Sequence, residues 1–200
     1  MDFLIYGRGV LSADDHGDTP QLDESHWSYM DAFADGMTAR GPTLSVDRQT
    51  WTGSLHVVDL PSAQAARAFA ANDPYHRAGL FTEHLIRHFD NLLGRTMWDF
   101  PSRRGEDKPF LVIVDAESDG PSPGGEEPLQ SSAPAAPALA ERLVVWGTLR
   151  PVHALRLSGV ALALVAPDLD AVRSLIADEP ALFGTSAHPE IHAWEFGGRR

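Results

Sequence analysis

The chain has 200 residues, a formal net charge of −12 at pH 7 and no cysteine. The lack of cysteine excludes disulfides, thiolate catalysis and thiolate-ligated zinc or iron–sulfur sites. The negative charge argues against nucleic acid and anionic membranes as partners, because both would repel such a surface. The sequence has no recognisable secretion signal and no apolar run near the roughly 18 residues of a membrane span, so we expect a cytoplasmic protein.

The chain repeats itself with a constant offset of 106 residues. The matched pairs include Gly41 and Gly147, Gly53 and Gly159, and Pro74 and Pro180. Such self-similarity without gaps indicates two copies of one supersecondary unit. We therefore expect a first domain at residues 1–97, a linker at 98–108 and a degenerate second repeat at 109–200. A segment at 116–137, rich in Pro, Ser, Gly and Glu, is expected to be a flexible insertion in the second repeat.

The first repeat predicts the order strand, helix, strand, strand, helix, strand, which is typical of a ferredoxin-like unit. Short apolar runs bounded by Gly or Pro indicate the strands, and apolar residues at helical spacing indicate the helices. The expected elements are a strand at 3–6, a helix from Asp23 to near Gly41, strands at 43–47 and 52–60, a helix from Ser62 to before Pro74, and a strand at 83–89.

The second repeat is expected to follow the same order. Its expected elements are a strand at 110–114, a first helix marked by Leu139, Leu143 and Trp146, a strand at 159–165, a helix capped by Asp168, and a strand at 191–196. A four-stranded sheet with both helices on one face leaves its other face uncovered. Two such sheets packed face to face solve this problem, and the tandem copy allows them to do so within one chain.

His26 and Asp73 form the sharpest candidate pair for chemistry. His26 lies on the apolar face of the first expected helix, and Asp73 follows the second. Both helices of this unit pack on the same face of the sheet, so the two side chains can approach each other. A carboxylate beside an imidazole orients one ring nitrogen and suits general acid–base catalysis. A buried histidine with a purely structural hydrogen bond remains the alternative.

The sequence around this pair resembles the YCII-related (YciI) family. The resemblance rests on His26-Trp27, Ala39-Arg40-Gly41-Pro42, Asn72-Asp73-Pro74-Tyr75 and Ala78-Gly79-Leu80. It implies the ferredoxin-like fold of the dimeric α/β-barrels and a site centred on His26 and Asp73. Relatives include a dehydrochlorinase that acts on a chlorinated hydroxyquinol. Members often carry an arginine three residues before the histidine, where this chain has Asp23.

The fold class that follows is α+β. We expect two ferredoxin-like (βαββαβ) repeats whose antiparallel sheets pack face to face as an intramolecular dimeric α/β-barrel. The chain is then either a monomer with pseudo-dimeric repeats or a homodimer of such chains.

Tyr75, Tyr6 and Trp51 are the side chains that we expect to bind the substrate. His76, His84 and His88, with His26, could be proposed as metal ligands. Of these, His84 and His88 are an i, i+4 pair, which would share one face of a helix. We place them on a strand instead, where residues four apart stand about 13 Å from each other. The sequence has no phosphate-binding loop or other cofactor motif. We therefore expect neither a metal nor a cofactor.

These observations favour a cofactor-independent small-molecule enzyme of the lyase or isomerase type. His26 would transfer a proton with the help of Asp73, and the substrate would be a small, aromatic or hydroxylated compound. The alternative is a non-catalytic α/β-barrel protein that binds a ligand or a partner. The second repeat has Ser132, Glu179 and Ala181 at the places of His26, Asp73 and Tyr75, so we expect it to be catalytically silent.

Overall fold

The architecture is described here from a computed structural model, for residues 1–10, 20–101, 106–115, 137–179 and 188–198. The expected flexible insertion at 116–137 therefore lies outside the described residues, apart from Pro137. No described helix is long and apolar enough to cross a bilayer.

Each repeat supplies four strands and its own helices. The first contains β1 (Asp2–Gly9), α1 (Pro20–Asp31), η1 (Ala34–Gly36), β2 (Met37–Leu44), β3 (Trp51–Asp59), α2 (Ala63–Asn72), α3 (Pro74–Arg77) and β4 (Phe81–Asn91). After η2 (Met97–Asp99), the second contains β5 (Lys108–Asp115), α4 (Pro137–Ala140), β6 (Leu143–Pro151), β7 (Gly159–Ala166), α5 (Leu169–Ala177) and β8 (Glu190–Trp194).

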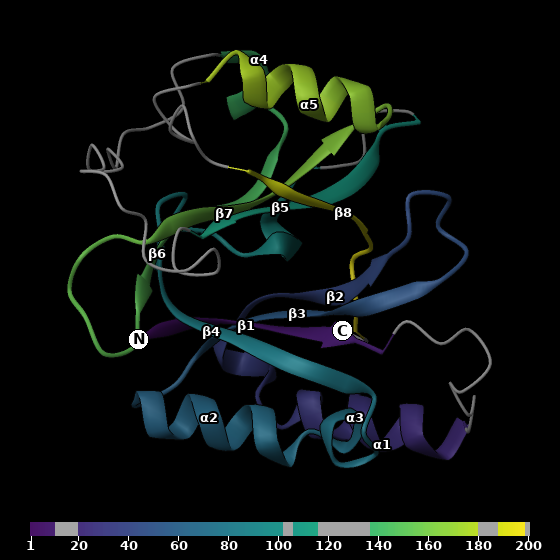
Figure 1. Ribbon diagram of the computed structural model, residues 1–200, viewed down its shortest axis with the longest axis vertical. Coiled ribbons are helices and arrows are strands. Elements are labelled where there is room, and N and C mark those ends of the chain that lie inside the picture. Colours follow the sequence, from purple (N-terminus) through teal and green to yellow (C-terminus); the bar gives the residue numbers. More distant parts are fainter. Residues whose placement is uncertain (11–19, 102–105, 116–136, 180–187, 199–200) are drawn as a thin grey trace.

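The eight strands close into one antiparallel barrel in the order β1-β3-β2-β8-β5-β7-β6-β4. Within this ring each repeat keeps the ferredoxin-like order, β4-β1-β3-β2 in the first and β8-β5-β7-β6 in the second. The two sheets face each other, with α1, α2 and α3 covering the outside of the first and α4 and α5 covering the second (Figure 1). The expected fold class is thus confirmed: two ferredoxin-like repeats form an α/β-barrel within one chain.

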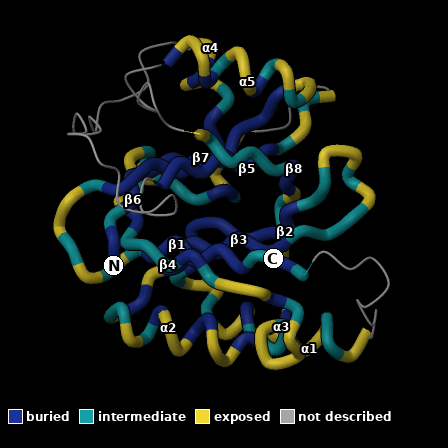
Figure 2. The backbone as a smooth tube through the Cα atoms, in the orientation of Figure 1, coloured by how far each residue is buried: buried dark blue, intermediate teal, exposed yellow. Residues whose placement is uncertain are grey.

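Three hydrophobic clusters stabilise these layers, and the alternation of side chains along the strands assigns residues to them. In β7, Val160, Leu162 and Leu164 pack towards the helices of the second repeat, whereas Ala161 and Ala163 belong to the cluster between the sheets. A third cluster lies under α1 and α2. Figure 2 shows the buried strands between helices whose outer faces are exposed.

One matched pair of glycines, Gly41 and Gly147, marks where the barrel closes. A Cβ on Gly41 of β2 would lie 1.9 Å from the Glu195 carbonyl oxygen, and one on Gly147 of β6 would lie 2.6 Å from the Asp90 carbonyl oxygen. Gly41 also has a φ of +157°. Both glycines therefore allow the backbones of the two repeats to approach closely, which explains why they match across the offset.

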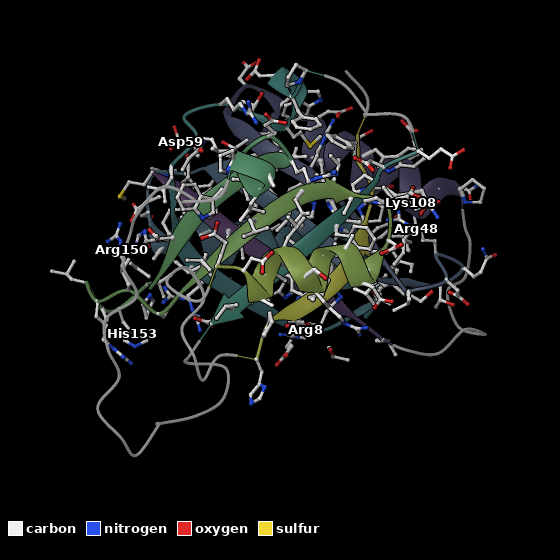
Figure 3. All side chains as sticks on the ribbon, turned by 90° about the horizontal axis from the view of Figure 1, so that it is seen from above. Arg8, Arg48, Asp59, Lys108, Arg150 and His153 are labelled. Carbon is white, nitrogen blue, oxygen red and sulfur yellow. The ribbon has the colours of Figure 1, made fainter. Side chains whose placement is uncertain are left out.

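The two repeats pair with each other at two seams of the barrel, β4 with β6 and β2 with β8, and different contacts stabilise the two seams. Strand β4 pairs with β6 over five residue pairs, and Arg150 Nη2 lies 2.8 Å from Asp90 Oδ1 across that seam. Strand β2 pairs with β8 over only two residue pairs. There Arg48, with a φ of 62°, donates 2.6 Å to the Pro109 carbonyl and 3.2 Å to the Trp194 carbonyl. Arg48 and Arg150 lie on opposite sides of the barrel (Figure 3).

Three expected elements are wrong, and all the errors concern the second strand of a repeat. One of them is the strand expected at 43–47, since β2 ends at Leu44 and residues 45–50 connect it to β3. The helix expected to reach Gly41 ends at Asp31, and residues 37–44 form β2. Likewise, residues 143–151 form β6 instead of continuing a first helix. The cause is that Met37, Leu143 and Trp146 pack in the same clusters as the helices before them, so their spacing imitates a helical face.

The helices that follow β3 and β7 begin where the sequence predicts. Ser62 Oγ accepts a 3.1 Å hydrogen bond from the Ala65 amide at the start of α2. Asp168 Oδ1 accepts one of 2.8 Å from the Ala171 amide at the start of α5. These caps satisfy amides that have no partner within the helix, which is why the two helices begin at equivalent places.

Candidate functional site

His26 and Asp73 meet between the helices and the sheet of the first repeat. His26 lies on α1, and Asp73 stands between the end of α2 and the start of α3. His26 Nδ1 lies 2.8 Å from Asp73 Oδ1, and the two side chains are only 8% and 3% exposed. The structure thus brings together the pair that the sequence singled out.

The backbone holds the Asp73 carboxylate in place. Its Oδ1 also accepts a 2.9 Å hydrogen bond from the Tyr75 amide, as the cap of α3. Burial alone would raise the pKa of Asp73, but the hydrogen bond and charge of His26, with His56 and the Tyr75 amide, lower it below its ordinary value. The carboxylate therefore stays ionised and fixes the orientation of the imidazole.

The Tyr75 ring covers the imidazole of His26. The two rings are stacked with their centroids 4.0 Å apart and their planes within 5°. The Tyr75 hydroxyl donates a 2.6 Å hydrogen bond to Asp23 Oδ1. Asp23 lies in the first turn of α1, which begins at Pro20 and not at Asp23 as the sequence suggested. It positions the tyrosine that stacks on His26.

An aromatic wall extends from Tyr75 along the sheet. The Trp51 ring lies 6.0 Å from that of Tyr75, and Phe81 lies 5.5 Å from Trp51 and 6.3 Å from Tyr75. Trp51 is therefore two rings removed from the imidazole of His26. The arrangement places one expected substrate-binding residue beside the pair and another at the end of the same wall.

Tyr6 lies elsewhere, on the opposite face of the sheet. Its neighbours in β1, Phe3 and Ile5, pack under the helices, whereas Tyr6 belongs to the cluster inside the barrel. The Tyr6 hydroxyl is 3.3 Å from both Thr43 Oγ1 and His192 Nε2. Burial raises the pKa of Tyr6 to about 12. The structure does not bring this expected substrate contact together with His26.

A polar chain joins Tyr6 to the second repeat. His192 Nε2 lies 2.8 Å from Glu190 Oε1, and Glu190 forms a two-pronged ion pair with Arg8, its second contact being 2.7 Å. Burial opposes ionisation of Glu190, but His192 and Arg8 outweigh it and lower its pKa to about 2. Arg8 is labelled in Figure 3. These residues link β1 to β8, which are not neighbours in the barrel.

Sequence reasoning missed His56 on β3. Its ring lies 5.8 Å from that of His26 and 5.6 Å from Phe69, and the residue is 4% exposed. Burial, followed by the charge of His26, lowers the pKa of His56 to about 3. A signal was present in the repeat, because position 162, the match of His56, is an apolar Leu162.

The remaining histidines do not gather into a metal site. The rings of His76 and His84 lie 4.9 Å apart, and burial, with His76, lowers the pKa of His84. His84 and His88 are on a strand, β4, as expected. In the part of the chain that the structure describes, no three histidine or carboxylate side chains are arranged to hold a metal ion.

The closed ring of two βαββαβ units, with the His26–Asp73 pair under the helices of the first, defines a tandem α/β-barrel. Residues 4–90 match the YCII-related domain. This stretch contains His26, Asp73 and Tyr75, and the first repeat is therefore a YCII-related domain. None of the curated proteins matches the sequence.

Several solved structures are similar to the chain, one over about half of it and others over nearly all of it. The 5-chloro-2-hydroxyhydroquinone dehydrochlorinase of Burkholderia phenoliruptrix, in complex with 2,5-dihydroxybenzoquinone, is 24% identical with a TM-score of 0.38, over 48% of this chain and 99% of its own. A proposed monooxygenase of Lactobacillus acidophilus is 8% identical with a TM-score of 0.48, over 97% and 92%. An anthrone oxidase-like protein is 11% identical with a TM-score of 0.43, over 97% and 90%.

Proposed function

We propose that the chain is a cofactor-independent enzyme that transfers a proton on a small molecule, with lyase or isomerase chemistry. The observation that carries the proposal is the 2.8 Å contact between His26 Nδ1 and the ionised Asp73. This contact commits one ring nitrogen to orientation and leaves Nε2 for the substrate. No described residue hydrogen-bonds Nε2, and Nε2 is not one of the fully buried polar atoms that lack a partner.

The reaction follows from the roles of these atoms. His26 Nε2 removes a proton from a carbon next to a carbonyl group, and the electron pair moves to the carbonyl oxygen as an enolate. Asp73 accepts the Nδ1–H and stabilises the imidazolium that forms. In an isomerase the imidazolium returns the proton to another atom. In a lyase the oxygen lone pair of the enolate re-forms the carbonyl, and the electron pair of the enolate C=C bond becomes a new double bond to the next carbon. A leaving group departs from that carbon with its bonding electrons, and the imidazolium passes its proton to the leaving group or to water.

The walls of the site favour a planar ligand. Tyr75 presents its flat face to His26, and Trp51 and Phe81 continue the aromatic surface. Aromatic faces stack well on flat, conjugated molecules. Hydroxylated quinones and phenols therefore head the list of compounds to test, with 2,5-dihydroxybenzoquinone as the first.

A non-catalytic role is the second candidate, and the burial of the pair favours it. With 8% and 3% exposure, His26 and Asp73 resemble a sealed structural ion pair more than an open site. In that case the pair would fasten α1 to the turn between α2 and α3, and any ligand or partner would bind elsewhere.

Replacing His26 with asparagine separates these two candidates. The asparagine amide can stand in for Nδ1 as a donor to Asp73, while the acid–base nitrogen is lost. For the enzyme we expect the melting temperature to stay within a few degrees and turnover to fall at least about 100-fold, the usual contribution of a general base.

The assay is a thermal-shift screen against quinones, phenols and other small metabolites, followed by turnover and solvent-deuterium exchange of each hit. Glu179→Gln is the matched control, because Glu179 occupies the place of Asp73 in the second repeat, and it should leave turnover unchanged. If no compound raises the melting temperature of the wild type or exchanges a proton, the enzyme proposal is rejected and the structural role of the pair stands.

A further inference from the structure

His56 is a buried polar side chain to which the described part of the chain gives no hydrogen bond. No described residue bonds either of its ring nitrogens, although the residue is only 4% exposed. Neither nitrogen is among the fully buried polar atoms that lack a partner, so both still touch accessible space. A polar side chain with so little exposure and no protein partner is uncommon in native proteins.

The second repeat shows that the fold does not need a histidine at this place. His56 pairs with Ile5 of β1 and Arg40 of β2. Its counterpart Leu162 pairs with Val112 and Trp146 in the same register. Leu162 is 1% exposed and packs under the helices of its own repeat. The same strand position thus serves packing in one repeat and carries a polar group in the other.

The geometry relates His56 to the acid–base pair. Its ring is 5.8 Å from that of His26, on the same face of the sheet, and 5.6 Å from Phe69 in an edge contact. Hydrogen bonds are about 2.9 Å long, so two neighbouring atoms of one small molecule can contact both imidazoles.

We propose that His56 is a substrate-binding residue of the enzyme, which donates a hydrogen bond to the oxygen next to the carbon that His26 deprotonates. This inference rests on the proposed function. It narrows the substrate to compounds with a carbonyl or enol oxygen adjacent to an acidic carbon, as in ketones and hydroxylated quinones. A donor aimed at the oxygen that gains charge stabilises the enolate.

The protonation state of His56 suits this role. Its pKa of about 3 keeps the ring neutral, with burial as the main cause, and His26, Arg40 and His84 act in the same direction against Asp73. A neutral imidazole has one N–H donor and one acceptor nitrogen. The ring can therefore donate to the substrate oxygen without competing with His26 for the proton.

The test follows the ring nitrogens of each histidine by NMR on protein labelled with ¹⁵N-histidine. The probes are 2,5-dihydroxybenzoquinone and every compound that raises the melting temperature in the screen. We expect the His26 and His56 signals to shift together on binding, while exposed His153 stays unchanged. The His56→Leu variant, which copies the second repeat, should bind the same compound about 10- to 100-fold more weakly, as expected for a lost buried hydrogen bond.

The outcomes separate this inference from the proposed function. If His26 shifts while His56 does not, and His56→Leu binds as tightly as the wild type, His56 is a packing residue and the inference fails alone. If neither histidine shifts with any probe, both proposals fail. A His56→Gln variant that recovers part of the affinity lost in His56→Leu supports the hydrogen bond, because glutamine restores a donor.

Discussion

The neutral, buried imidazole of His56 makes the stability of the protein depend on pH in a way that can be calculated. The pKa of His56 is about 3 in the folded protein, against an ordinary value of 6.5 that applies to the unfolded chain. Below pH 6.5 the unfolded chain therefore binds a proton that the folded protein does not bind. The free energy of unfolding falls as the pH drops through this window and levels off near pH 3.

The magnitude follows from the two pKa values. Each pH unit within the window removes about 1.4 kcal/mol, and rounding near pH 6.5 leaves a loss of about 2 kcal/mol between pH 7 and pH 5 from His56 alone. Burial also lowers the pKa of His84 and His88, which adds to the wild-type slope with the same sign. The lowered pKa of Asp73 acts only near and below 3.8, outside this interval.

The assay compares wild type and His56→Leu by urea unfolding at pH 5, 6 and 7, with His153→Gln as an exposed control. The leucine variant should lose about 2 kcal/mol less than the wild type between pH 7 and pH 5. At pH 7 it should be at least as stable, because it removes an unpartnered polar group. Equal losses in wild type and variant would refute the neutral buried state of His56.

Three further predictions test other parts of the structure. Arg87→Met should lower the free energy of unfolding by about 3–5 kcal/mol, because it removes the guanidinium 2.6 Å from the Asp115 carboxylate, which is 1% exposed. Calorimetry measures the loss, and Asp115→Asn in the same background should recover part of it. Gly41→Ala should destabilise the protein by several kcal/mol, because the added Cβ clashes with the crossing backbone, and amide exchange in β2 and β8 should become faster. In the control Gly79→Ala the added Cβ meets nothing within 4 Å, so this variant should cost about 1 kcal/mol. Tyr75→Phe should keep the ring stack but lose the hydrogen bond to the Asp23 carboxylate on α1. The stability measured by thermal unfolding should then fall by about 1 kcal/mol, and the proton-transfer rate should stay within about tenfold of the wild-type rate. A complete loss of turnover would assign the hydroxyl a chemical role.

The fold was accessible from the sequence because the repeat and the turn residues were strong signals. Matched glycines revealed the repeat, and the caps Ser62 and Asp168 located the strand-to-helix junctions. The second strands were misread because Met37 and Trp146 continue the buried spacing of the preceding helices. Gly36 and the β-branched pair at 144–145 favoured a break and a strand, and comparing the two copies would have exposed the same error twice.

The candidate site was partly accessible for a different reason. His26 and Asp73 stood out as a titratable pair at helix ends, and family resemblance pointed to the same residues. The sequence could not show that Tyr6 lies apart from His26 and Asp73. Alternation along a strand says that neighbouring residues lie on opposite faces of the sheet, but not which face is which. In the structure Ile5 packs under the helices and Tyr6 packs inside the barrel. His56 was missed because β3 carries other polar residues, such as Thr52 and Ser54, so a histidine there looks ordinary until it is compared with Leu162.

Closing the barrel through both seams within one chain changes what selection can act on. In a homodimer the two-fold axis forces every substitution to appear twice, so a residue that suits one site also alters the other half of the barrel. In this chain a substitution on β3 leaves β7 unchanged, and the two repeats do differ at one matched position, with His56 on β3 and Leu162 on β7. The halves also remain together at any dilution, because their association is intramolecular. Covalent linkage thus lets the side chains of the two halves diverge independently while the barrel stays closed.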